Sequence, residues 1–170
     1  DGQLSWMQLR WMLIEILNSL AHAHARRIVP RDLKPDNVLL TEGERGRTAL
    51  KLADFGIAHS FEPTRKQKTR DFNTLYAGTP AYMAPEQLLG EWRDFGPWTD
   101  LYALGCMAFE CCCGTVPFEG QNMFEIMHKQ LSSDPSSFTP NMMAPLGRDE
   151  WIMRLLEKDP MRRFATAADA

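Results

Sequence analysis

Three polar side chains suited to chemistry lie within six residues of each other in RIVPRDLKPDNVLL, residues 27–40. Asp32 could accept a proton from a hydroxyl group, Lys34 could hold a negatively charged group, and Asn37 offers a hard oxygen ligand to a metal ion. A further carboxylate, Asp54, follows the next apolar run. Phosphoryl transfer from ATP needs this set: an acid to orient the hydroxyl, a cation for the phosphate and oxygen ligands for Mg²⁺.

Short β-like runs flank this chemistry. NVLL (37–40) and TALKLAD (48–54) are separated by a polar segment that contains glycine, which predicts a hairpin with Asn37 and Asp54 on its two sides. Before them, residues 4–27 have apolar side chains at a spacing of three to four, which predicts a long amphipathic helix. Ser5 and Gln8 have the spacing of a capping box at its start.

Three more helices are predicted downstream. Residues 99–114, TDLYALGCMAFECCCG, are apolar on nearly every face, so we expect a buried central helix that ends at Gly114. Residues 122–131 begin with an Asn–Glu capping box, and residues 148–160 form an amphipathic pattern that we expect Pro160 to end. The expected fold class is therefore α+β, mainly α.

Five motifs in a fixed order resemble those of the eukaryotic-type serine/threonine protein kinase family. They are RDLKPDNVLL (31–40), LADFG (52–56), GTPAYMAPE (78–86), DLYALG (100–105) and DPMRR (159–163). The resemblance implies the family's large C-terminal lobe, with a buried central helix and a short hairpin at the catalytic loop. The short hairpin and compact loops are similar to those of bacterial members. A second DFG at Asp94–Gly96 lacks the preceding strand that the motif requires, so Asp94 is expected to be a loop residue.

The resemblance implies a role for each matching catalytic position. Asp32 would orient the acceptor hydroxyl as the base, and Lys34 would contact the transferred phosphate of ATP. Asn37 and Asp54 would hold Mg²⁺, and Thr79 would bridge Asp32 and Lys34 when a protein substrate with a serine or threonine is bound.

Other matching positions are implied to support the fold. Glu86 and Arg163 look like the family's buried ion pair, and Asp100 looks like the residue that braces the catalytic loop. Phe55 and Gly56 complete the metal-binding motif.

Arg31, directly before Asp32, is similar to the arginine of kinases that are activated by phosphorylation. A phosphate in residues 57–77 could pair with Arg31 and order that segment. Thr64, Thr69 and Thr74 are the candidates, and Thr69 and Thr74 are closer to GTP (78–80). The alternative is that the basic residues within 65–70 form an ordinary solvent-exposed surface with no part in regulation.

Pro30 departs from the pattern, because the family has a histidine there that hydrogen-bonds nearby backbone beside Phe55. Proline lacks both a ring donor and a backbone N–H. One lost hydrogen bond costs about 0.5–1.5 kcal/mol, which is on the order of tenfold in rate if all of it reached the transition state, so Pro30 predicts an impaired kinase more readily than an inactive one. The alternative is a pseudokinase, a binding or scaffold module without catalysis. A small-molecule kinase is disfavoured by GTPAYMAPE (78–86), which resembles a peptide-positioning segment.

The chain contains neither the G-x-G-x-x-G nor the V-A-I-K motif of the family's small N-terminal lobe. We therefore expect residues 1–170 to be the C-terminal lobe only, cut from a longer protein, with the N-terminal lobe as its missing partner and negligible activity alone. A formal charge of −3 gives no reason to expect a nucleic-acid partner, and no apolar run is long enough for a membrane span. A cytoplasmic catalytic domain is expected, although the full-length protein could be membrane-anchored.

Overall fold

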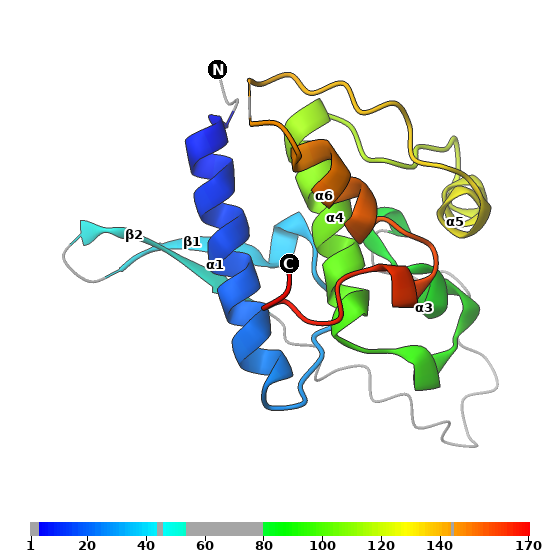
Figure 1. Ribbon diagram of the computed structural model, residues 1–170, viewed down its shortest axis with the longest axis horizontal. Helices are drawn as coiled ribbons and strands as arrows, with labels where there is room; N and C mark the ends of the chain where they lie inside the picture. Colours follow the sequence, from blue (N-terminus) through cyan, green and yellow to red (C-terminus); the bar gives the residue numbers. More distant parts are fainter. Residues whose placement is uncertain (1–3, 44–45, 54–79, 144) are drawn as a thin grey trace.

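The computed structural model describes residues 4–43, 46–53, 80–143 and 145–170. In this part of the chain, helices pack around one central helix and a two-stranded sheet projects to one side (Figure 1). The mainly helical α+β prediction is confirmed. The elements are α1 (Trp6–His24), β1 (Val38–Glu42), β2 (Thr48–Leu52), α3 (Pro85–Leu89), α4 (Pro97–Cys113), α5 (Met123–Ser132) and α6 (Arg148–Leu155), with 3₁₀ turns η1 (Pro35–Asn37), η3 (Pro80–Tyr82), η4 (Trp92–Asp94) and η5 (Pro160–Arg162).

Helix α1 begins with the predicted capping box. The backbone N–H of Gln8 donates to the Ser5 hydroxyl, and the Gln8 side chain accepts from the Ser5 N–H. The predicted apolar stripe faces the core, because Leu9, Ile16 and Leu20 are almost fully buried. Helix α1 therefore packs along α4 and against β2 (Figure 1).

Helix α4 is the predicted buried central helix. Its large side chains Tyr102 and Phe109 are fully buried. A Cβ on Gly105 would lie 2.8 Å from the Cβ of Leu155, so glycine here lets α6 pack directly on α4. The helix ends as expected at Gly114, which has a φ of 80° that glycine adopts without strain.

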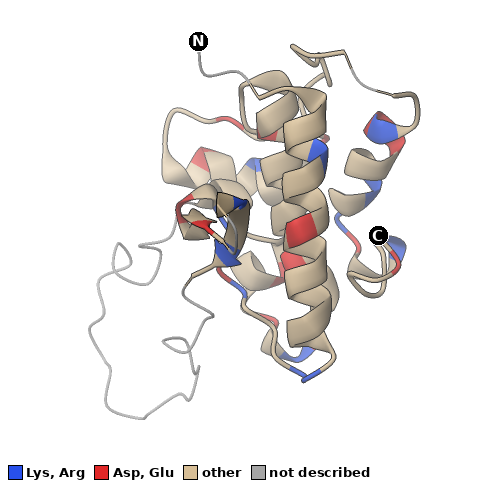
Figure 2. Cartoon of the chain, turned by 90° about the vertical axis from the view of Figure 1, so that its left-hand side faces the viewer, with Lys and Arg blue, Asp and Glu red and all other residues tan. Residues whose placement is uncertain are grey.

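The predicted hairpin is present, with β1 and β2 antiparallel and Val38 opposite Leu52. The first residue of β1 directly follows Asn37, and a hydrogen bond from the Ala53 N–H to the Asn37 carbonyl (2.8 Å) continues the pairing. The sheet therefore extends to the loop that carries the polar residues. Figure 2 shows Lys and Arg interspersed with Asp and Glu over the hairpin, without a face of one sign.

The predicted end of α6 is wrong. The helix ends at Leu155 rather than at Pro160. The backbone carbonyls of Glu157 and Lys158 instead accept hydrogen bonds from the Arg163 guanidinium (2.7 and 3.0 Å), so a side chain orders this stretch.

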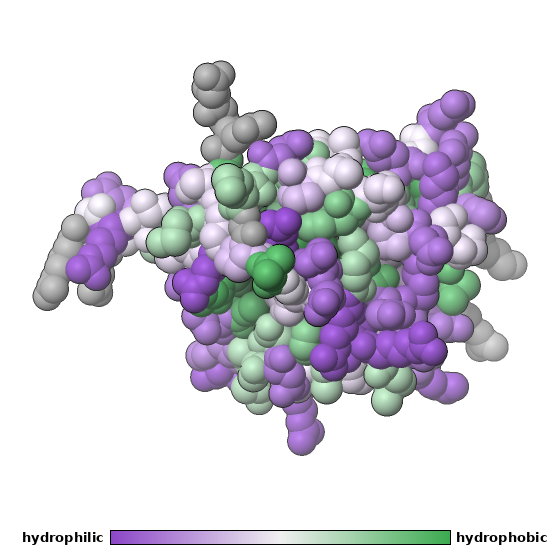
Figure 3. All heavy atoms as spheres, turned by 45° about the horizontal axis from the view of Figure 1, so that its top comes forward, coloured by the Kyte–Doolittle hydropathy of each residue, from purple (hydrophilic) through white to green (hydrophobic). Residues whose placement is uncertain are grey.

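The surface is mixed in character. Figure 3 shows several small apolar areas separated by hydrophilic residues on the face it presents. Among the described residues, no helix has the length and apolar character that crossing a membrane requires.

Candidate active site

The loop between α1 and β1 is fixed at its base by a buried carboxylate. Asp100, near the start of α4, accepts hydrogen bonds from the Arg31 backbone N–H (2.7 Å) and from His24 Nε2 at the end of α1 (2.9 Å). Burial raises the pKa of Asp100, while the bonds from His24 and Arg31 act in the opposite direction. Arg31 has a φ of 65°, a left-handed conformation that is uncommon for a side-chain-bearing residue. Asp100 thus holds the loop in an otherwise unfavourable shape.

The polar residues predicted from the sequence meet at the next step of this loop. Lys34 Nζ lies 3.2 Å from Asp32 Oδ2, and the Asn37 side-chain nitrogen donates to the backbone carbonyl of Asp32 (2.7 Å) and to its Oδ2 (3.0 Å). Asn37 is buried, whereas the side chain of Asp32 is 34% exposed. The carboxylate is therefore oriented by two neighbours and remains open to a reacting group.

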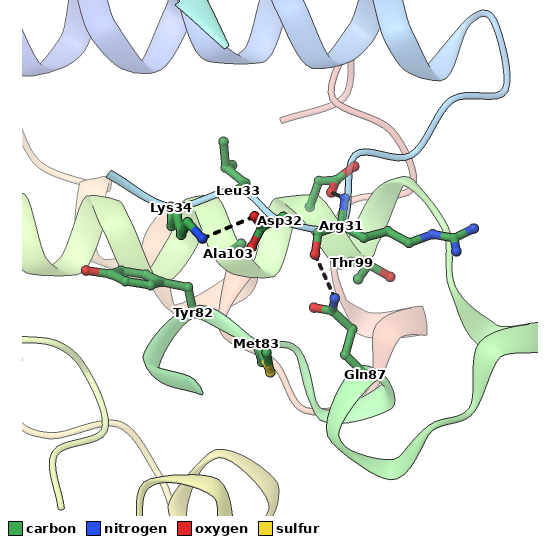
Figure 4. A pocket seen from close by; sticks show the side chains of 10 residues that line it. Arg31, Asp32, Leu33, Lys34, Tyr82, Met83, Gln87, Thr99 and Ala103 are labelled. Atoms are coloured by element: carbon green, nitrogen blue, oxygen red, sulfur yellow. Dashed lines mark hydrogen bonds and ion pairs between the residues drawn. The ribbon is translucent and has the colours of Figure 1, made fainter. Parts of the chain in front are cut away.

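A turn from a distant part of the chain faces this carboxylate (Figure 4). Tyr82 and Met83 line a small cavity of about 20 Å³ together with Asp32 and Lys34. The side-chain nitrogen of Gln87 donates to the Arg31 carbonyl (2.9 Å), which joins the start of α3 to the loop. The cavity has room for a group the size of a water or a hydroxyl.

Tyr82 is held from the other side by α4. Its hydroxyl donates to Glu110 Oε2 at 2.6 Å. Burial and this hydrogen bond raise the pKa of Tyr82 well above its usual range. Tyr82 therefore keeps its proton, which it shares in a hydrogen bond with Glu110, and its ring forms a fixed wall of the cavity.

A protein kinase domain model matches residues 1–169 of the chain. The chain belongs to the protein kinase family. It is 38% identical to serine/threonine-protein kinase Pkn1 of Myxococcus xanthus over 92% of its length, and 34% identical to serine/threonine-protein kinase PrkC of Bacillus subtilis over 99%. It is also 33% identical to serine/threonine-protein kinase 36 of Pongo abelii over 97% of its length.

The chain spans only a fraction of these kinases. It covers 22% of the Myxococcus protein, 25% of the Bacillus protein and 12% of the Pongo protein. The resemblance read from the five motifs is confirmed at the level of the family.

The structure brings Glu86 and Arg163 together in the position where the kinase motifs led us to expect an ion pair. Two parallel bonds join them, Nη1 to Oε1 at 2.9 Å and Nη2 to Oε2 at 3.0 Å, and both side chains are buried. The Thr99 hydroxyl also donates to Glu86 Oε1 (2.9 Å). The remaining guanidinium N–H groups donate to the carbonyls of Trp98, Glu157 and Lys158, so this buried cation is fully hydrogen-bonded.

Several residues singled out from the kinase motifs lie outside the described residues. They are Asp54, Phe55, Gly56, Thr64, Thr69, Thr74 and Thr79. Pro30 lies in the described part of the chain and is buried. The contact that a histidine at this position would make involves Phe55, which lies outside the described residues. The Arg31 guanidinium lies 5.2 Å from the centre of the Phe95 ring, within the second DFG. Asp94 of that triplet is exposed in η4.

Sequence reasoning missed a second group of polar residues beside the candidate site. Gln130 of α5 is fully buried and bonded to the turn at residues 80–81, to Tyr102 and, through its backbone carbonyl, to Lys158. The sequence does hold a signal that could have found this group. Gln130 lies on the inward side of the amphipathic pattern of residues 122–131, and Tyr102 lies within the mainly apolar segment of residues 99–114.

Proposed function

We propose that the protein containing these residues is a serine/threonine protein kinase that transfers the γ-phosphate of ATP to a hydroxyl on a protein substrate. The observation that carries the proposal is the orientation of Asp32. Lys34 and Asn37 fix its carboxylate, and the turn at residues 80–83 faces it. The names of the relatives, all serine/threonine kinases, agree with this function.

Each side chain has a distinct part in the proposed reaction. Asp32 accepts a hydrogen bond from the acceptor hydroxyl and takes up its proton as the oxygen attacks. Lys34 is close enough to Asp32 to contact the phosphate that approaches the same oxygen. Because the nitrogen of Asn37 makes both bonds to Asp32, its oxygen is the atom that would coordinate Mg²⁺.

Asn37 and Asp54 would hold the metal, since both offer the hard oxygen ligands that Mg²⁺ prefers. Bound Mg²⁺ would neutralise charge on the phosphates. Thr79 would bridge Asp32 and Lys34 once substrate is bound. Phosphorylation of Thr69 or Thr74 would regulate the site through Arg31, whose exposed guanidinium now lies over Phe95.

We assign residues 1–170 to the large lobe, which supplies the acceptor side of the reaction. The motifs that cover the phosphates in the family do not occur in this sequence. ATP would therefore need the small lobe, and these residues alone would transfer phosphate negligibly.

The alternative is a pseudokinase, and Pro30 is the observation that favours it. Pro30 is buried at the base of the loop and supplies no donor there. The adjacent Arg31 is nevertheless held by Asp100, so the loop keeps its shape without a histidine. This favours an enzyme weakened at Pro30 over a protein without catalysis.

The test follows transfer of γ-labelled phosphate from Mg-ATP to dephosphorylated casein by the full-length natural protein. Asp32→Asn should reduce transfer by about 100-fold or more, because it removes the base. Pro30→His should raise transfer by up to about tenfold. Native transfer no higher than that of Asp32→Asn would overturn the proposal. Recovery in Pro30→His would then assign the loss to that one residue.

A further inference from the structure

Gln130 is a fully buried amide in a helix whose other residues are at least partly exposed. It lies near the end of α5 and reaches toward η3 and α4. A buried amide is costly unless each polar atom finds a partner. The hydrogen bonds of the Gln130 side chain therefore show which elements it holds together.

The side chain of Gln130 uses both of its polar atoms. Its nitrogen donates to the carbonyls of Ala81 (2.7 Å) and Pro80 (3.2 Å), and its oxygen accepts from the Tyr102 hydroxyl. Tyr102 is also fully buried. The amide therefore joins the backbone of η3 to the central helix α4.

The backbone that Gln130 holds is the one that faces the catalytic carboxylate. Tyr82 and Met83 directly follow Pro80 and Ala81 and line the cavity beside Asp32 (Figure 4). A shift of the two carbonyls would move this wall of the cavity. It would leave Asp32 in place, because Asp32 is oriented by Lys34 and Asn37.

The geometry points to Gln130 as a positioning residue that sets the affinity for the acceptor segment of the protein substrate, an inference that rests on the proposed function. Gln130 fixes the turn at residues 80–83 through two carbonyls, and in the proposed reaction the acceptor segment would lie against this turn, because the turn lines the cavity beside Asp32. Lys158 supports it by donating to the Gln130 backbone carbonyl (2.7 Å).

The experiment compares two substitutions in the full-length natural protein, with casein as acceptor. Gln130→Met keeps the length of the side chain and removes its bonds to the turn. Tyr102→Phe removes the hydroxyl that bonds Gln130 but leaves both bonds from Gln130 to the turn available. Both lose a buried hydrogen bond, so both should unfold at a lower temperature.

Gln130→Met should raise the KM for casein about fivefold while kcat and the KM for ATP stay within about twofold. Tyr102→Phe should leave the KM for casein close to the native value. Hydrogen exchange of the amides in residues 80–89 should accelerate in Gln130→Met only, which reports on the turn independently of catalysis.

An unchanged KM for casein in Gln130→Met, or an equal rise in both variants, would overturn the inference and leave the amide with a role in stability alone. Absence of transfer by the native protein itself would instead overturn the proposed function. The native assay therefore separates the two failures.

Discussion

At the scale of single residues, the candidate site depends on how one carboxylate is oriented. Asp32 is bonded to two side chains of its own loop, and the loop is bonded to Asp100 on another element. Asp32, Lys34 and Asn37 are thus close in sequence, while Asp100, which shapes their loop, is distant. A substitution at Asp100 would change the backbone conformation of the loop at Arg31, but it would not remove a group that takes part in the proposed phosphate transfer.

The two DFG triplets allow a matched test of the metal ligand in the full-length protein. Asp54→Asn should reduce phosphate transfer at least about 100-fold, because it removes a charge that would hold Mg²⁺ opposite the phosphates. Asp94→Asn makes the same change at an exposed position in η4 and should leave transfer near the native rate. Transfer measured over a range of Mg²⁺ concentrations checks both. An equal loss in the two variants would contradict the assignment.

At the scale of elements, α5 is fastened at its C-terminal end by a cation from another segment. Lys158 Nζ donates to the carbonyls of Gln130 (2.7 Å) and Lys129 (3.3 Å) and lies 3.6 Å from the centre of the Phe118 ring. A positive charge at a helix C-terminus opposes the partial negative charge of the last carbonyls. Lys158, in the segment after α6, therefore helps to fix the position of α5 and of Gln130.

The burial of Lys158 predicts a dependence of stability on pH, because burial disfavours the charged form in the folded chain. Burial lowers the pKa of Lys158 to about 8, whereas in the unfolded chain its pKa is about 10.5. The folded chain therefore releases this proton at a lower pH than the unfolded chain does, so the free energy of unfolding should rise between those two values. The difference between native protein and Lys158→Met, measured by urea unfolding, should increase across this window.

Lys129→Met is the control for this prediction. Lys129 is 39% exposed and pairs with Glu125 on the surface of α5. Its substitution removes a lysine charge from the same helix at an exposed position and should change the free energy of unfolding by less than about 0.5 kcal/mol. A difference for Lys158→Met that stays constant with pH would show that its proton does not couple to folding.

At the scale of the whole molecule, one buried ion pair joins α3 to the segment after α6. Removing one partner of such a pair leaves a buried charge unpaired and costs about 3–5 kcal/mol. Glu86→Gln and Arg163→Met should each lower the free energy of unfolding by about this amount. The double variant should cost less than the sum, by about 1–3 kcal/mol, because neither charge is then stranded.

Arg162→Met is the matched control, since Arg162 lies beside Arg163 but has a 72% exposed side chain that is 4.0 Å from Glu157. It should change the free energy of unfolding by less than about 0.5 kcal/mol. Urea unfolding of all variants checks the cycle. Additive losses for Glu86 and Arg163 would show that the two residues act independently.

The sequence predicted those parts of the fold that depend on periodicity. The stripe along α1, the apolar α4 and the hairpin each follow from spacing within one segment, and the cluster of Asp32, Lys34 and Asn37 lies within one loop. The end of α6 and the burial of Gln130 did not follow. Both depend on partners elsewhere: Arg163 orders the stretch after α6, and Gln130 is bonded to a tyrosine 28 residues away in the sequence.

The sequence distance across the Glu86–Arg163 pair also has a consequence for synthesis. The two residues are 77 positions apart, and ribosomes add about 5–20 residues per second. Arg163 is therefore synthesised about 4–15 s after Glu86. His24 and Asp100, whose contact braces the loop that carries Asp32, are both made long before Arg163. During translation the loop that carries Asp32 can thus be assembled while the segment around Glu86 still lacks its anchor. Helix α3, which carries Glu86, gains this anchor only after residue 163 has been made.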